Sequence, residues 1–159
     1  MSETESTLGP LPNGVRHPYT ALLEALPRTA NRTLVEALEL PAIATAWRHA
    51  STGEARELAA LDRSLLENPA YAAEAAKSLQ LGHESLKHLL PLRDSRPLQR
   101  HADAVENGEA PGGHLAILGL MMALFSIPPR QALLDYARAR LPQAGAAPDV
   151  ISGILDQAA

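Results

Sequence analysis

The stretch HLAILGLMMALF, residues 114–125, decides the fold expected for this chain. After His114 it contains only apolar residues and one glycine, so a helix formed by it has no polar face. A helix that is apolar on all sides is normally the buried centre of a bundle. The run is also shorter than the roughly 20 residues that cross a bilayer. The stretch therefore predicts a central buried helix and no membrane span.

The second strong pattern lies in residues 70–90, where apolar side chains recur at helical spacing. At 100° per residue one face collects Ala72, Ala75, Ala76, Leu79, Gly82, Leu86, Leu89 and Leu90. Asn68 and Pro69 give this helix an N-cap followed by proline at its first position. Because the face is rich in alanine and glycine, we expect a neighbouring helix to approach it closely.

Further start and stop signals divide the rest of the chain into shorter helices. Pro41 is expected to end the pattern of residues 29–40 and to begin a helix over 42–50. Residues 51–54 have the form of a capping box for the next helix, which carries Leu58, Leu61 and Leu65 on one stripe. The other expected segments are 19–26, 98–106, 130–141 and 150–157.

Composition supports the same fold class. Apolar residues make up 46% of the 159 residues but aromatic ones only 3%, so the core must consist largely of alanine and leucine, which favour helix over strand. The length suits one domain. We predict an all-α, single-domain bundle of about six or seven helices over residues 19–159, preceded by a disordered polar tail over residues 1–18.

Charge and cysteine content exclude several functions. The formal net charge is −4 and no basic stripe is visible, which disfavours nucleic-acid binding. The absence of cysteine removes disulfides, zinc ribbons, iron–sulfur clusters and thiol nucleophiles. The polar N-terminus has no apolar core of a secretory signal. We expect a soluble, cytoplasmic protein with no membrane partner.

One motif resembles a metalloprotease helix but has the wrong spacing. His83 and His88 flank Glu84 at i and i+5, whereas the zinc motif needs histidines at i and i+4. On a regular helix the two imidazoles then diverge by about 140°. We predict no metal site and no catalytic residue, with a metal-dependent hydrolase that uses His83 and His88 as a rival hypothesis.

The remaining polar residues are expected at the surface. We interpret Glu54, Glu57, Asp62 and Glu67 as a solvated helix face, and Arg93, Arg96, Arg100 and His101 as a solvated loop. His49 and His114 fall at helix ends, where surface histidines are common. Gly112 and Gly113 predict a turn.

An ordered set of segments resembles the UreF family of urease accessory proteins. LPAIATAWRHA (40–50) is similar to the family's helix that begins with Leu-Pro and carries an aromatic residue before a basic one. LAALDRSLL (58–66), EAAKSLQLGHESL (74–86), GHLA (113–116), and Ile127-Pro128 with ALLDY (132–136) follow in the family's order. The resemblance covers roughly residues 33–136.

Two departures identify the chain as a diverged or N-terminally shortened relative. The family's first helix has no counterpart in residues 9–17, and Asp149 stands where the family's late helix has an arginine.

The resemblance implies an all-helical, non-catalytic scaffold or chaperone, often dimeric. It would bind UreD/UreH and the GTPase UreG and assist nickel insertion into apo-urease. It implies that the complex handles nickel and that this chain binds no cofactor directly. The residues that match the family's motifs, and are therefore the partner-binding candidates, are Trp47, Glu74, Gly82, His114 and Tyr136. Trp47, Gly82 and Tyr136 also suit a purely structural role. The alternative is a generic helical protein–protein interaction module unrelated to urease.

Overall fold

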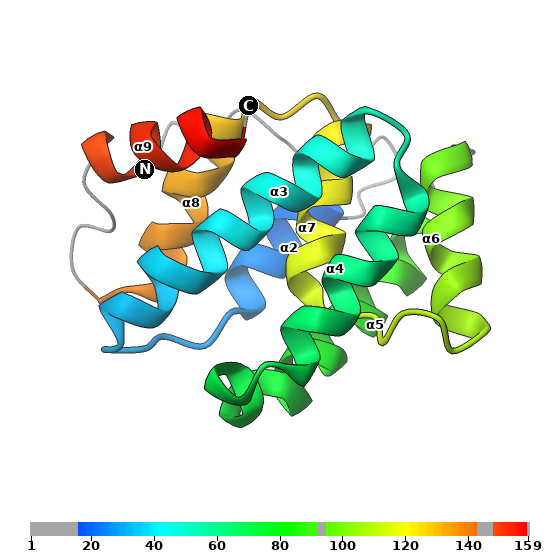
Figure 1. The fold of residues 1–159 in the computed structure, drawn as a ribbon, viewed down its shortest axis with the longest axis horizontal. Coiled ribbons are helices and arrows are strands. Elements are labelled where there is room, and N and C mark those ends of the chain that lie inside the picture. Colours follow the sequence, from blue (N-terminus) through cyan, green and yellow to red (C-terminus); the bar gives the residue numbers. More distant parts are fainter. Residues whose placement is uncertain (1–15, 92–94, 143–147, 159) are drawn as a thin grey trace.

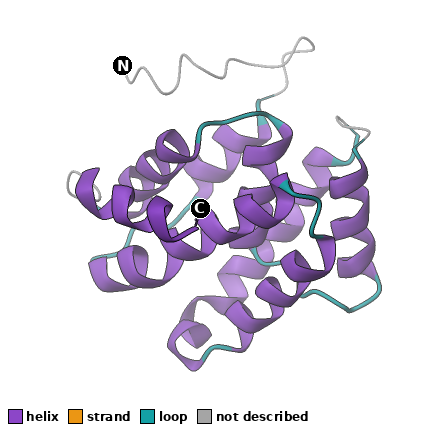
Figure 2. Ribbon diagram, turned by 45° about the horizontal axis from the view of Figure 1, so that its top comes forward, coloured by secondary structure: helices purple, strands orange, loops and turns teal. Residues whose placement is uncertain are grey.

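The computed structural model describes residues 16–91, 95–142 and 148–158, and all regular structure in these ranges is helical (Figures 1 and 2). This confirms the predicted all-α fold. The described residues form eight α-helices: α2 (Pro18–Ala25), α3 (Leu40–Ser51), α4 (Ala55–Glu67), α5 (Ala75–Leu89), α6 (Arg96–Glu106), α7 (His114–Leu124), α8 (Pro129–Arg140) and α9 (Pro148–Ala158). A π-helical segment, η1 (Leu34–Glu39), precedes α3, and a 3₁₀ segment, η2 (Pro69–Glu74), precedes α5.

Helix α7 is the centre of the bundle, as its sequence predicts. Every residue from His114 to Met122 is buried. Helix α3 crosses α7 in Figure 1, and α4, α5 and α6 also contact it. Because α7 has neighbours on several sides, burial of its whole circumference is favourable, at about 25 cal/mol per Å² of apolar surface.

The crossing of α3 and α7 depends on small side chains. A Cβ added to Gly119 would lie 2.4 Å from the Cβ of Ala46 and 2.6 Å from the backbone nitrogen of Trp47. Such distances are far below van der Waals contact, so only glycine fits in α7 at this point. Trp47 itself is half-buried and packs at the edge of the core.

Pro41 does not interrupt the helix, contrary to the sequence-based prediction. The helical backbone continues from η1 into α3, and Leu40 N–H donates to Val35 O across the wider π turn. Proline lacks an N–H and its ring clashes with the carbonyl four residues earlier in a regular α-helix. A π turn just before Pro41 inserts an extra residue, and this relieves the clash.

The predicted capping box at residues 51–54 is also wrong. Ser51 is the last residue of α3, and the Thr52 hydroxyl donates to Arg48 O at 2.9 Å instead of capping the next helix. Gly53 then reverses the chain at φ +73°, a conformation that glycine adopts without strain. These residues end α3 and do not cap α4.

The predicted helix over 70–90 begins as η2 and becomes α5 at Ala75. Its buried face includes Ser78, Leu81 and Gly82, whereas Ala76 and Leu90 of the predicted apolar face are exposed. The polar Ser78 is buried because its hydroxyl forms hydrogen bonds with His114 of α7.

The predicted disordered tail lies mostly outside the described residues, which begin at Arg16. His17 is buried and caps α2, since its Nδ1 accepts a hydrogen bond from Tyr19 N–H at 3.1 Å. Among the described helices none is both long and apolar enough to cross a membrane.

Candidate functional site

A buried cluster of polar side chains joins η1, η2, α7 and α8. Its centre is Glu39, which is fully buried because the π turn directs it inward. Arg140 donates from Nε to Glu39 Oε1 and from Nη2 to Oε2, both at 3.0 Å. Tyr71 donates its hydroxyl to Glu39 Oε2 at 2.6 Å. A buried carboxylate is stable only when it is paired in this way.

Arg140 also binds two further groups. Its Nη2 donates to Glu74 Oε1 at 3.0 Å, and its Nη1 donates to Pro27 O at 2.7 Å. Although burial opposes its charge, the hydrogen bonds and charge of Glu39 raise the pKa of Arg140. Burial and the Glu39 charge likewise raise the pKa of Tyr71, so it remains a neutral hydrogen-bond donor.

His114 extends the cluster into the central helix. Its Nε2 lies 2.9 Å from the hydroxyl of Tyr136, and its Nδ1 lies 2.8 Å from the hydroxyl of Ser78. Burial, followed by the positive charge of Arg140, lowers the pKa of His114 to about 3. His114 is therefore a neutral internal residue, and the expectation of a surface histidine is wrong.

A second buried group lies where the chain enters α7. Asp62 accepts hydrogen bonds from Gly112 N–H at 2.8 Å and from Gly113 N–H at 3.0 Å. The anion thus sits at the positive end of the α7 dipole. Burial raises the pKa of Asp62 to about 6, an effect that these two hydrogen bonds oppose. The expectation that Asp62 belongs to a solvated face is wrong, whereas Glu57 and Glu67 are exposed as expected.

His101 is the third buried histidine of the described chain, after His17 and His114. Its Nε2 lies 3.7 Å from Asp62 Oδ2, and among the described residues neither ring nitrogen has a hydrogen-bond partner. Burial lowers the pKa of His101 to about 4. Of the residues predicted to form a solvated loop, Arg96 and Arg100 lie on the outer face of helix α6 and His101 on its inner face, whereas Arg93 lies outside the described residues.

The metalloprotease-like pair does not converge. His83 and His88 are both exposed on α5, and His83 Nε2 lies 2.9 Å from the carbonyl oxygen of Pro111. Within the described ranges, no three His, Asp or Glu side chains are grouped so that they could hold a metal ion.

Three of the five candidate residues meet in the buried cluster. Glu74 is linked to Tyr136 through Arg140 and Glu39, and Tyr136 contacts His114; only Glu74 is partly exposed. Gly82 lies beside the Asp62 group instead, because a Cβ there would be 2.0 Å from Gly112 O. Trp47 lies apart from the cluster at the edge of α3. Whether these residues bind a partner stays a prediction.

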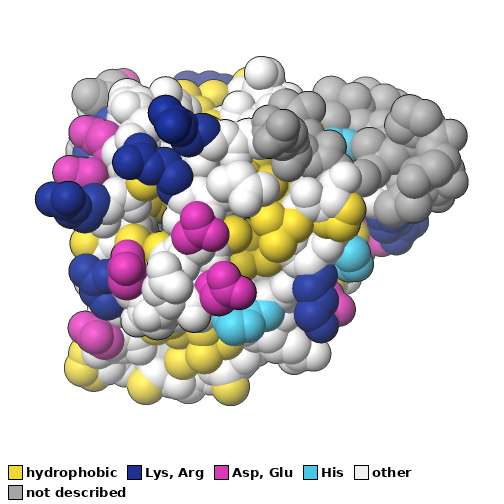
Figure 3. Space-filling view, turned by 90° about the vertical axis from the view of Figure 1, so that its right-hand side faces the viewer, with side chains coloured by type: hydrophobic (Ala, Val, Ile, Leu, Met, Phe, Trp, Pro, Cys, Tyr) yellow, Lys and Arg dark blue, Asp and Glu magenta, His cyan; other side chains and the backbone are white. Residues whose placement is uncertain are grey.

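A surface groove lies between the turn that joins α3 to α4 and the first turns of α6. It has a cavity volume of about 80 Å³ and opens to solvent, and it is lined by His49, Ala50, Gly53, Glu54, Ala55, Leu58, Arg96, Pro97 and Arg100. Figure 3 shows the face that carries α6, where Lys and Arg side chains are interspersed with Asp and Glu side chains around exposed hydrophobic ones. The sequence pattern does not reveal this groove, because its two sides are about 45 residues apart in the chain.

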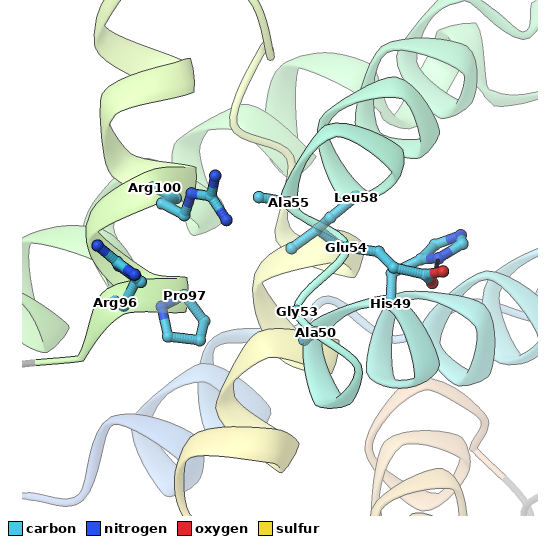
Figure 4. Close-up of a pocket in the computed structure, with 9 residues that line it drawn as sticks. All are labelled: His49, Ala50, Gly53, Glu54, Ala55, Leu58, Arg96, Pro97 and Arg100. Carbon is cyan, nitrogen blue, oxygen red and sulfur yellow. Dashed lines mark hydrogen bonds and ion pairs between the residues drawn. The ribbon is translucent and has the colours of Figure 1, made fainter.

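The charges of the groove are uneven. The Glu54 carboxylate points to His49, with 2.8 Å between Oε1 and Nδ1, and away from the arginines (Figure 4). That hydrogen bond is the main cause that lowers the pKa of Glu54. Arg96 and Arg100 form no ion pair with any described residue, and Arg100 extends across the gap towards Ala55 (Figure 4). The groove therefore has an apolar floor and two arginines that no described carboxylate pairs with.

Comparison with known proteins gives one match. A sequence model described as UreF matches residues 28–143. No curated protein and no solved structure matches the chain significantly. The matched range contains α3 to α8, and so contains the buried cluster, Asp62 and the groove.

Proposed function

Because the chain belongs to the UreF family of urease accessory proteins, we propose that it is a non-catalytic cytoplasmic scaffold in nickel insertion into apo-urease. The family match carries this proposal. In it the chain acts as a chaperone that holds other proteins in place while the metal is transferred.

The proposed partners are UreD/UreH and the GTPase UreG, which the scaffold connects to apo-urease, and a second copy of the chain is a further candidate. Nickel is the cargo of the assembled complex, and this chain contributes surface and no coordinating cofactor site. The helical bundle suits such a role, since a rigid core can present several faces at once.

The arrangement of polar groups supports the absence of catalysis. Glu39, Arg140 and His114, which have the chemistry of an active site, are buried and bonded to one another or to neighbouring helices. Such a saturated network stabilises one arrangement of helices and leaves no group free to attack a substrate. The solvent-facing feature is a groove with cations and apolar atoms, a combination suited to protein association.

Of the five candidate residues, Trp47 and Glu74 are the two whose side chains reach the surface. We propose these two as direct contacts. Gly82, His114 and Tyr136 would act indirectly, because they hold α5, α7 and α8 in register.

A reconstitution experiment tests the proposal. Apo-urease, UreD and UreG are co-expressed with or without this chain, and nickel per urease and ammonia release are measured. We expect equal amounts of urease protein, but lower nickel content and activity when the chain is omitted. Tagged chain should also co-purify with UreD or UreG. If it co-purifies with neither and nickel content is unchanged, a general helical interaction module becomes the better description.

A further inference from the structure

We infer that the groove between the α3–α4 turn and α6 binds an acidic segment of a partner protein, with an apolar side chain of that segment seated between carboxylates. The proposal takes the identity of the partner from the scaffold role proposed above. The chemistry of the groove itself does not depend on that role.

The floor of the groove requires an apolar group. Ala50, Ala55, Leu58 and Pro97 line it, and they offer no side-chain hydrogen bond to a ligand. Leu58 is only 2% exposed and forms the base of the groove, so a ligand would contact mainly the side chains around it. An aliphatic side chain placed there would exchange water for carbon contacts at about 25 cal/mol per Å².

The rim of the groove requires negative charge. Arg96 and Arg100 are one helical turn apart on α6 and both line the groove; the Arg100 guanidinium extends across the gap, whereas that of Arg96 lies on the outer side of α6 (Figure 4). Glu54, the carboxylate that lines the groove, is already bonded to His49 at 2.8 Å and lies 3.8 Å from Arg48. Because no described carboxylate neutralises Arg96 or Arg100, a ligand carboxylate has two partners available.

A peptide fits these features better than a nucleic acid. Phosphates could satisfy the arginines, but they leave the apolar floor uncovered. An acidic segment with one or two leucines satisfies both the floor and the rim.

The first measurement uses a fluorescein-labelled peptide, Glu-Glu-Leu-Leu-Glu-Glu, and fluorescence anisotropy with the full chain. Two matched peptides replace every Glu by Gln or both Leu by Ala. We expect the acidic leucine peptide to bind most tightly, and its affinity to fall at high salt because the arginines are exposed. A labelled single-stranded oligonucleotide serves as the competing class of ligand.

Two variants alter the groove without touching the core. Arg96→Glu/Arg100→Glu reverses the rim charge, and it places an acid in the first turn of α6, where the helix dipole favours it. Ala55→Trp fills the groove from α4. Arg138→Glu/Lys87→Glu is the control, since it changes net charge equally at exposed positions that do not line the groove. Circular dichroism checks that each variant is folded.

We expect the two groove variants to weaken peptide binding by about tenfold, and the control variant to bind like the wild type. The proposal is overturned if the wild type does not bind the acidic peptide, if all variants bind it equally, or if the oligonucleotide binds more tightly.

Purified UreD and UreG then separate this proposal from the scaffold function. If a partner binds the wild type and the control but not the groove variants, the groove is its docking surface. If the partner binds the groove variants as well as it binds the wild type, the docking proposal is wrong, but the scaffold role is unaffected. If neither partner binds the wild type, the scaffold role fails, and the peptide measurements alone decide the chemistry of the groove.

Discussion

Glu39 and Arg140 are 101 residues apart in the sequence, and their side chains form a bidentate ion pair in the interior of the bundle. The pair joins the π-helical segment η1 to the last turn of α8. Through the same guanidinium it also fixes Glu74 at the end of η2 and the carbonyl of Pro27 in the chain after α2. Four segments therefore depend on one cation.

Removing that cation should destabilise the whole bundle. Arg140→Met leaves Glu39 buried without its counter-charge, which we expect to lower the free energy of unfolding by about 3–5 kcal/mol. Urea unfolding followed by circular dichroism measures the change. Arg138→Met, at an exposed position on the same helix, is the control and should change stability by less than about 0.5 kcal/mol. Equal effects of the two substitutions would contradict a special role for the buried pair.

Gly82→Ala tests the close approach of α5 to the loop before α7. Alanine usually stabilises a helix relative to glycine by about 1 kcal/mol. Here the new Cβ would lie 2.0 Å from the backbone oxygen of Gly112, which has little freedom to move. We expect net destabilisation by about 1–3 kcal/mol in thermal or urea unfolding. Gly153→Ala in α9, where a Cβ meets nothing within 4 Å, should instead stabilise the protein. A stabilised Gly82→Ala variant would show that the loop moves aside.

His114 should make stability depend on pH. Burial holds its folded-state pKa at about 3, below the usual histidine value of 6.5, so the unfolded state binds this proton more readily. His114 therefore does not lower the free energy of unfolding above pH 6.5. As pH falls from 6.5 towards 3, protonation of the unfolded state lowers that free energy by up to about 1.4 kcal/mol per pH unit. His114→Gln lowers stability at neutral pH but should flatten the slope over this window. His88→Gln, at an exposed position, is expected to keep the slope of the wild type. Urea unfolding from pH 7.5 to 4 compares the three proteins.

Asp62→Ala tests the carboxylate at the start of α7. The substitution leaves the amides of Gly112 and Gly113 without their acceptor, and an unsatisfied buried donor costs about 1–3 kcal/mol. We expect lower stability and faster hydrogen exchange at both amides, measured by NMR. Asp103→Ala, an exposed aspartate on α6, should leave the exchange of both amides unchanged. Unaltered protection in Asp62→Ala would mean that water replaces the carboxylate.

Several features of the fold could be predicted from the sequence alone. The run over residues 114–125 identifies the central helix, because a helix without a polar face is stable only when it is surrounded. Asn68 and Pro69 mark a helical start, and the Asn68 side chain does accept from Ala70 N–H at 2.9 Å. The order of motifs predicted the UreF family, and the family match confirms it.

Other features depend on groups that are distant in the sequence. Asp62 and Glu57 lie on the same helix and have the same chemistry, yet only Asp62 is buried, because α7 begins opposite it. The inward direction of Glu39 follows from the π turn before Pro41, which rotates the helix face relative to the periodic pattern.

The sequence by itself determined which segments are helical and which one is central, since periodicity and apolar content act locally along the chain. The tertiary structure decided which polar residues are inside and where the open groove lies. Burial of an ion and the walls of a groove depend on what packs against them, and here those neighbours come from helices that are remote in the sequence.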